Sequence, residues 1–316
     1  MKNLGLSLIA LAGLMFVACN EEPLTKPEGP KEYTVSLQLG GEILDIAYGD
    51  LTKGENDHDL YGIEVFSKVV GSNDSYGHYA YGLFDNMSGV TINLLDGYEY
   101  QFVASMVVDG KEKINYYSDG YSSPFFHIGT EIGSTSIGTQ FVYSNSVYFG
   151  SMGLGSGYSS LLNTSNSVYH PCLDRYYGEV SGFVPGQNTS VSIDMKRTAF
   201  GLNVRTQGFT EGTLSIQVEQ GSTLALSYPD TELNRIFTFN YVQSAWYTDN
   251  YKETIPVSII WTKDNGNEVL LASQSFDFYR NKVTIITVQV AEASSASSIS
   301  VNLESDPMTD GPSYNI

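Results

Sequence analysis

Basic residues and cysteines are scarce in this sequence. It has 16 Lys and Arg against 35 Asp and Glu in 316 residues, a formal net charge of −19. A surface of this sign repels phosphate backbones, so we expect no nucleic-acid partner. The two cysteines, Cys19 and Cys172, are too few for a disulfide framework. Stability therefore has to come from burial, which a chain of this length can supply.

Recognisable catalytic motifs are also lacking. The histidines are far apart in sequence, and no H-E-x-x-H motif occurs. The stretch GLGSGYSS has no lysine of a phosphate loop and does not match G-x-S-x-G. Acidic residues are plentiful, but nothing in the sequence selects a catalytic pair. We expect a non-catalytic protein without a cofactor.

The one long apolar run lies at the start of the chain. Lys2 precedes LGLSLIALAGLMFVA, which is shorter than the ~20 apolar residues of a membrane-spanning helix. The layout is that of a secretory signal over residues 1–18. Cys19 follows Ala18, and FVAC resembles the lipobox of bacterial lipoproteins. That resemblance implies cleavage before Cys19 and its acylation, for example with palmitate; an ordinary signal peptide with a chance cysteine is the alternative.

Residues 19–32 are predicted to form a flexible tether. Asn20, Glu21 and Glu22 resemble the surface-export signal of lipoproteins in some Gram-negative gut and oral bacteria. A plain solvated linker is the alternative interpretation of these residues. Prolines and a glycine disfavour a helix or a central strand here. We expect outer-membrane lipid as the partner of acylated Cys19, and a chain exposed at the cell surface.

Beyond the tether the pattern predicts an all-β protein. The segment YTVSLQL (residues 33–39) alternates with the two-residue period of a half-buried strand, and LYGIEVFSKVV repeats the pattern. Asp96-Gly97, Asp109-Gly110 and Asn265-Gly266 are dipeptides typical of hairpin turns. Strand follows strand without intervening helices, which favours β-sandwiches over a βαβ fold.

The predicted domains follow from this pattern. We place an N-terminal β-sandwich over residues 33–190, a C-terminal one over 191–304 and a tail over 305–316. Between about residues 118 and 171 the alternation weakens to loops rich in Gly, Ser and Asn, with room for one short helix. Such loops are often functional, but a poorly packed decoration is the alternative.

Four segments occur in a characteristic order: VACNEE, DLYGIEVF (59–66), VSIDMKRTAFGLNV (191–204) and YRNKVTIITVQV (279–290). In this order they resemble the fimbrillin-like surface lipoproteins, a family of pilus subunits, anchors and accessory adhesins, in which the third segment is similar to a strand pair opening a second domain. The resemblance implies two tandem transthyretin-like, Greek-key β-sandwiches. It also implies a role in cell adhesion or pilus assembly, with other pilus subunits as partners through β-strand addition at an open sheet edge.

The sequence departs from that family at its processing site. In polymerising members a protease cuts at a basic residue, usually arginine, near the first strand. Here the first arginine is Arg175, while Lys31 and Lys53 flank the predicted first strand and leave a lysine-specific cut open. The departure favours a protein that keeps its lipid, either an anchor or a stand-alone adhesin.

Two groups of residues suggest metal ligands. Asp57 and Asp59 suggest a calcium loop, with Asp50 and Glu55 as further candidates, but a solvated turn is the simpler interpretation. The second group, His170, Cys172 and Asp174, alternates so that one face of a strand would present all three side chains. Unrelated roles are the alternative, and Cys172 then reads as a small buried hydrophobe rather than a reactive thiol.

Clusters of tyrosine suggest a competing function. YAYGLF, NYYSDGY and DRYYG lie near predicted turns, and tyrosine faces stack on sugar rings. A glycan-binding surface lipoprotein of a polysaccharide-uptake system, with Tyr176 and Tyr177 as glycan contacts, is therefore the alternative function. Half-buried cross-strand packing explains the same residues without a ligand.

Overall fold

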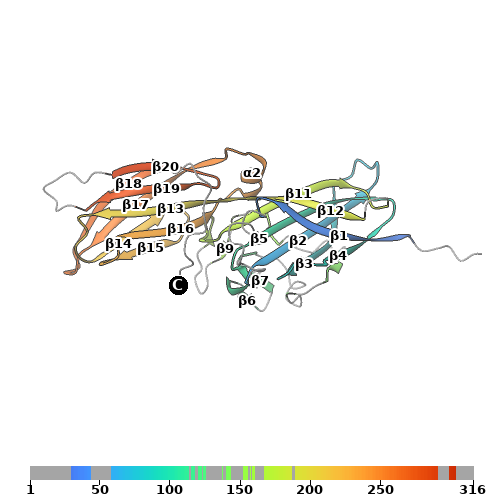
Figure 1. Cartoon of the computed structure of the whole chain (residues 1–316), viewed down its shortest axis with the longest axis horizontal. Helices are drawn as coiled ribbons and strands as arrows, with labels where there is room; N and C mark the ends of the chain where they lie inside the picture. The colour runs from blue at the N-terminus through green and yellow to red at the C-terminus, as the bar shows by residue number, and fades with distance from the viewer. Residues whose placement is uncertain are drawn as a thin grey trace, which may run out of the picture. The chain divides into compact units, whose positions relative to one another are not determined.

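The computed structural model describes residues 30–43, 58–113, 115–117, 120–122, 124–125, 137, 140–143, 152–155, 157, 159–160, 167–186, 189–290 and 299–303. The candidate lipidation and export residues Cys19, Asn20, Glu21 and Glu22 lie outside these ranges, as does Asp57. All the strands and helices below belong to one compact unit, Glu32–Ile316. Figure 1 shows that this unit consists almost entirely of strands.

The first lobe is a single sheet of eight strands in two halves. One half has the order β4 (Thr91–Leu95), β1 (Glu32–Gly41), β12 (Ser190–Arg197). The other continues with β11 (Arg175–Phe183), β5 (Tyr98–Val107), β2 (Leu60–Val69), β3 (Gly77–Phe84) and β8 (Val142–Tyr143). The halves are joined where Tyr176 and Tyr177 pair with Arg197 and Lys196. Apolar side chains from both halves share one core, so the lobe is a sandwich.

The two-residue period explains how the core forms. Val35 and Leu37 of β1 are buried, as the alternation predicts. The prediction of a half-buried strand is wrong for β2, however, because both of its faces are covered. Ile63 and Val65 enter the main core, while Leu60 packs into a second cluster with Phe125, Met152 and Leu154.

Parts of the loop-rich segment pack against this second cluster. The elements between β5 and β11 also include a 3₁₀ turn, η1 (Gly110–Lys113), and short strands: β6 (Asn115–Tyr117), β7 (Gly120–Ser122), β9 (Ser159–Ser160) and β10 (Ser167–Val168). Phe125, Met152 and Leu154 are each at most 2% exposed. At these three residues the segment therefore belongs to the packed lobe and is not a poorly packed decoration.

The second lobe is a sandwich of two four-stranded sheets. One has the order β16 (Glu232–Thr238), β13 (Ala199–Gln207), β19 (Val283–Gln289), β20 (Ile299–Leu303). The other has the order β15 (Thr223–Ser227), β14 (Thr213–Val218), β17 (Lys252–Thr262), β18 (Glu268–Tyr279). One turn of helix, α2 (Val242–Tyr247), follows β16. Phe200, Phe237 and Phe278 are among the fully buried side chains of its core.

The all-β class and the two-sandwich architecture are thus confirmed, but the predicted boundary needs correction. β12 pairs with β1 and β11, so it completes the first lobe rather than opening the second. The chain changes lobe at Thr198, between β12 and β13. Alternation along a strand does not reveal which sheet the strand will join, and the boundary near residue 190 was too early for that reason.

One of the three predicted hairpin turns is confirmed. Gly266 adopts a φ value of +84°, a conformation that favours glycine, between the paired strands β17 and β18. Gly97 has a φ value of +82° in the tight turn between β4 and β5, but these two strands do not pair with each other, so this turn does not close a hairpin. Asp109-Gly110 also forms a turn, with a positive φ at Asp109, but it leads into η1 rather than into a paired strand. The hairpin prediction is wrong there.

Candidate functional site

The strand that follows the tether lies inside a sheet. β1 pairs in parallel with β12 from Ser36 to Gly41, and antiparallel with β4 from Glu32 to Ser36. Its buried residues belong to the core of the first lobe. The two pairings follow one another along β1 and overlap at Ser36, so the strand is held by a different neighbour in each of its halves.

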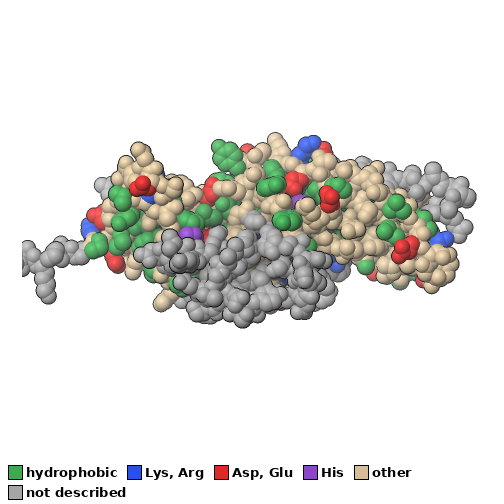
Figure 2. Space-filling view, turned by 180° about the vertical axis from the view of Figure 1, so that it is seen from behind, with side chains coloured by type: hydrophobic (Ala, Val, Ile, Leu, Met, Phe, Trp, Pro, Cys, Tyr) green, Lys and Arg blue, Asp and Glu red, His purple; other side chains and the backbone are tan. Residues whose placement is uncertain are grey.

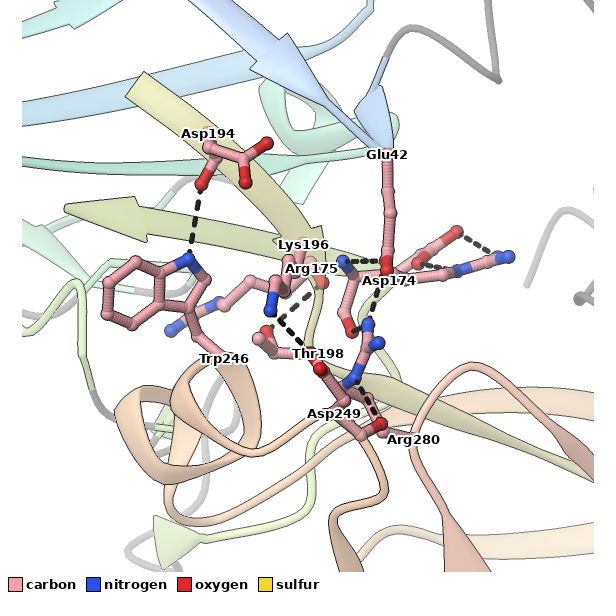
Figure 3. Close-up of polar contacts among 10 residues, drawn as sticks. Glu42, Asp174, Arg175, Asp194, Lys196, Thr198, Trp246, Asp249 and Arg280 are labelled. Atoms are coloured by element: carbon pink, nitrogen blue, oxygen red, sulfur yellow. Dashed lines mark hydrogen bonds and ion pairs between the residues drawn. The ribbon is translucent and has the colours of Figure 1, made fainter. Parts of the chain in front are cut away.

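A latch of three charged residues holds the far end of β1, as Figure 3 shows. The Glu42 carboxylate accepts hydrogen bonds from the Arg197 backbone N–H at 2.8 Å and from Arg280 Nη1 at 2.7 Å. Arg280 also donates to the Arg197 carbonyl at 3.0 Å, and only 8% of its side chain is exposed. We call Glu42, Arg197 and Arg280 the latch. It joins the first strand of one lobe to the end of β18 in the other.

A second ion pair lies next to the latch. The Asp174 carboxylate accepts hydrogen bonds from Arg197 Nε at 2.8 Å and from Arg197 Nη2 at 2.6 Å. Both side chains are largely buried, with 3% of Arg197 and 11% of Asp174 exposed. The bidentate geometry and the low exposure make this a strong, directional contact. The Arg175 carbonyl accepts the Thr198 backbone N–H at 2.8 Å, which fixes the crossing between lobes.

Two further contacts cross between the lobes at the helix α2. Trp246 Nε1 donates to the Asp194 carbonyl at 3.1 Å, and Lys196 pairs with Asp249 at 2.6 Å (Figure 3). The Lys196 ammonium holds the pKa of Asp249 below its ordinary value. Because 78% of the Asp249 side chain is exposed, solvent screens this pair, and the buried contacts do more to hold the lobes together.

Tyrosine hydroxyls close the outer edge of β4. The Leu37 N–H donates to the Val90 carbonyl, so the alternation of an antiparallel ladder turns the peptide groups of Asn93 and Leu95 away from β1. Tyr143 accepts the Asn93 N–H at 2.9 Å, and Tyr79 donates to the Asn93 carbonyl at 2.7 Å.

The hydroxyl of Tyr100 completes this arrangement. It accepts the Leu95 N–H at 2.8 Å and donates to the Leu95 carbonyl at 3.2 Å. We call Tyr79, Tyr100 and Tyr143 the tyrosine seal. Burial raises the pKa of both Tyr79 and Tyr100. Tyr79 and Tyr100 therefore keep the hydroxyl protons that they donate to the Asn93 and Leu95 carbonyls.

The tyrosines proposed as glycan contacts are not at the surface. Tyr176 is 3% and Tyr177 is 2% exposed, because β11 is an interior strand with a core on each face. The proposed contact through these residues is therefore wrong, since neither ring has a face open to a sugar. The packing alternative explains both residues.

The three alternating side chains near residue 172 have separate partners. His170 Nε2 lies 3.6 Å from Glu253, Asp174 pairs with Arg197, and Cys172 packs on the second-lobe core. Burial raises the pKa of the Cys172 thiol, which disfavours the reactive thiolate. The side chains do not converge, so they do not form the metal site considered from their spacing.

The remaining calcium candidate has a structural role. Asp59 is 5% exposed and accepts the Asp109 backbone N–H at 3.0 Å, which stabilises the turn after β5. Within the described ranges there is no group of three or more His, Cys, Asp or Glu side chains suited to a metal ion. On the face shown in Figure 2, described acidic and basic side chains are scattered rather than gathered in one basic patch.

Sequence reasoning missed both the latch and the seal. Glu42 and Arg280 are 238 residues apart, and no local pattern links them. YAYGLF did mark a tyrosine-rich strand that contains Tyr79, but not the peptide group that this residue would reach. Among the described helices, none is long and apolar enough to cross a membrane.

Comparisons with known proteins give matches among solved structures. No family model and no curated protein matches the chain. A candidate cell adhesion protein from Bacteroides uniformis is 14% identical, with 86% of this chain and 97% of that one covered and a TM-score of 0.35. The truncated tip fimbrial protein Mfa3 from Porphyromonas gingivalis is 10% identical, with 87% and 99% covered and a TM-score of 0.35.

A third match is a candidate polysaccharide binding protein from Bacteroides thetaiotaomicron. It is 12% identical, with 88% of this chain and 98% of that one covered and a TM-score of 0.41. Adhesion and fimbrial proteins, the class named by the sequence resemblance, thus recur among the matches. The identities and TM-scores are low, however, and the fold assignment rests on the strand pairing described above.

Proposed function

We propose that this protein is a lipid-anchored, surface-exposed, non-catalytic protein of cell adhesion or pilus anchoring. Acylated Cys19 holds it to the outer membrane, and Asn20, Glu21 and Glu22 direct it to the outside of the cell. The two sandwich lobes then act as a scaffold that meets other cells, surfaces or pilus subunits.

The observation that carries this proposal is the placement of β1. The tether ends at the residue before Glu32, where β1 begins, so any tension on the anchor enters the fold through this strand. β4 pairs with the first half of β1, up to Ser36, and β12 pairs with the second half, so both neighbours would have to be released before the strand could leave the sheet.

The latch supports retention of the anchor. Glu42 ties the end of β1 to Arg280, so tension on the tether is passed to the second lobe as well. Loss of β1 would remove Val35 and Leu37 from the core and would leave β4 without its sheet partner. Together with the absence of arginine before Arg175, this favours an anchor or a stand-alone adhesin over a processed stalk subunit.

The test compares Cys19→Ser with the matched control Cys172→Ser in cells that express the full chain. Labelled palmitate is expected to enter the wild type and the control but not Cys19→Ser. Only the first two should restore adhesion to cells that lack the protein. Equal labelling of Cys19→Ser refutes the anchor, and protection of the wild type from protease added to intact cells refutes surface exposure.

Retention of β1 has its own readout. Mass spectrometry of wild-type protein shed from cells or shaved from their surface should show no mature N-terminus at Glu32 or Gly54, the residues after Lys31 and Lys53. A predominant N-terminus at either position would show that the tether is cut and would overturn the anchoring role.

A further inference from the structure

β15 is an edge strand whose outward peptide groups have no described partner. The Tyr228 N–H donates to the Gly212 carbonyl, so the ladder alternation also turns Leu226 and Leu224 toward β14. Thr223, Ala225 and Ser227 therefore direct their N–H and C=O groups outward. Among these groups, the described residues engage only the Ser227 carbonyl, which accepts the Asp230 N–H.

Three other edge strands, β4, β16 and β18, carry obstacles that β15 lacks. The tyrosine seal covers β4. On β16, Arg235 donates to the Asn234 carbonyl and the Thr238 N–H donates to the Pro171 carbonyl. β18 carries Asp277, paired with Lys252, near one end. Charged side chains and covered peptide groups are the usual protection of an edge; β15 carries no charge, and of its outward peptide groups only the Ser227 carbonyl is covered by described residues.

The sequence of β15 is nearly symmetric about its centre. It reads Thr-Leu-Ala-Leu-Ser, with Ala225 in the middle and small, exposed residues at the outward positions. In an antiparallel pair of two copies centred on Ala225, Leu224 faces Leu226 and Thr223 faces Ser227. The outward groups other than the Ser227 carbonyl, which already accepts the Asp230 N–H, then form about four backbone hydrogen bonds between the copies.

We propose that this face binds a second copy of the chain, with β15 pairing antiparallel to β15 across a two-fold axis at Ala225. The contact is isologous, so it closes after two copies and builds no fibre. The charge of the chain favours contact at this edge. Two copies with a formal net charge of −19 each repel one another over most of their surface. β15 carries no charge, and neither do the residues on the solvent side of β14, which are Thr213, Ser215 and Gln217. This inference is independent of the lipid anchor.

Site-specific oxidative crosslinking of the full chain tests the register. The variant Ala225→Cys places two thiols on the axis, where Cα atoms of a hydrogen-bonded pair lie about 5.5 Å apart, within disulfide range. It should form a disulfide-linked dimer on a non-reducing gel, well above the wild-type background from Cys19 and Cys172. Ser215→Cys, on the same face one strand inward, is the matched control and should stay at background.

The off-axis positions sharpen the geometry. Thr223→Cys should not crosslink with itself, but it should crosslink with Ser227→Cys when the two variants are mixed. Crosslinking of Ala225→Cys at the level of the Ser215→Cys control overturns the proposal, and so does efficient self-crosslinking of Thr223→Cys.

A second experiment measures association without new thiols. Ala225→Pro removes the outward N–H at the axis, which β14 does not use, whereas Ala225→Ser keeps it. Sedimentation should show dimers for the wild type and Ala225→Ser, and at least a tenfold weaker dimer for Ala225→Pro with an unchanged circular dichroism spectrum. A wild type that stays monomeric, or equal association of the two variants, refutes the proposal; if Ala225→Pro does not fold, the crosslinking result decides.

Discussion

β4 and β15 are similar edge strands, but their outward peptide groups have different hydrogen-bond partners. Each has five residues, alternates buried and outward positions, and carries no charge. The outward peptide groups of Asn93 and Leu95 on β4 are hydrogen-bonded to tyrosine hydroxyls. Those of Thr223 and Ala225 on β15 have no partner among the described residues. Strand composition alone therefore does not decide whether an edge is open.

The difference lies in what surrounds each strand. Tyr79, Tyr100 and Tyr143 come from β3, β5 and β8, the half of the first lobe that lacks β4, and their hydroxyls reach its edge. They replace a missing strand with side-chain donors and acceptors. No such residues reach β15 within the described part of the second lobe, which leaves its outward peptide groups to water or to the backbone of another chain.

The largest expected effect comes from removing the seal. The triple variant Tyr79→Phe, Tyr100→Phe, Tyr143→Phe leaves the outward groups of Asn93 and Leu95 unpaired, and each unsatisfied group costs about 1–3 kcal/mol if it stays buried. We expect a loss of about 2–5 kcal/mol in the free energy of unfolding, measured by urea denaturation, together with new self-association at β4.

Single variants rank the contributions within the seal. Tyr100→Phe should cost most, because its ring is fully buried and its hydroxyl serves both peptide groups of Leu95. Tyr143→Phe should cost less than about 1 kcal/mol, because 49% of Tyr143 is exposed and water can replace the bond. A triple variant within about 0.5 kcal/mol of the wild type would contradict a stabilising seal.

Alkaline pH should weaken the β4 edge but not the β15 edge, with a smaller effect on the free energy of unfolding than removal of the seal. Burial raises the pKa of Tyr79 and of Tyr100 above about 10, the value in the unfolded chain. The stability that the protonated seal contributes is thus fully present below about pH 10 and is lost as pH rises through the raised pKa values. β15 has no titratable side chain, so its pairing has no such dependence of its own.

Urea denaturation at several pH values above neutrality measures this loss. Tyr79→Phe should reduce the fall in stability, whereas the control Tyr247→Phe, at a residue that is 82% exposed, should not change it. An identical pH profile for Tyr79→Phe and the wild type would show that the seal does not carry the effect.

The sequence predicted local features well, because they depend on neighbouring residues. The alternation of β1 and the glycine turns at Gly97 and Gly266 required only side-chain period and backbone conformation. The single turn of α2 was missed, because six residues are too few to show a helical period.

Long-range features were beyond that reasoning. Tyr176 and Tyr177 were identified by residue type, but their burial depends on two cores assembled from distant strands. The latch joins Glu42 to Arg280 across most of the chain, and only the docking of two lobes brings them together. The open edge of β15 likewise depends on distant residues, because no described side chain from elsewhere in the fold covers its outward peptide groups.

The smallest effect on stability, and the clearest contrast between the edges, is expected from a lysine on β15. Ala225 is exposed, so Ala225→Lys should change the free energy of unfolding by no more than about 0.5 kcal/mol. Two lysines would meet at the two-fold axis, and sedimentation should show the dimer lost. Thr91→Lys, at an exposed position of β4, is the control and should leave dimerisation unchanged, because the seal already closes that edge. Dimers of Ala225→Lys at wild-type strength, or loss of dimers in Thr91→Lys, would place self-association elsewhere on the molecule.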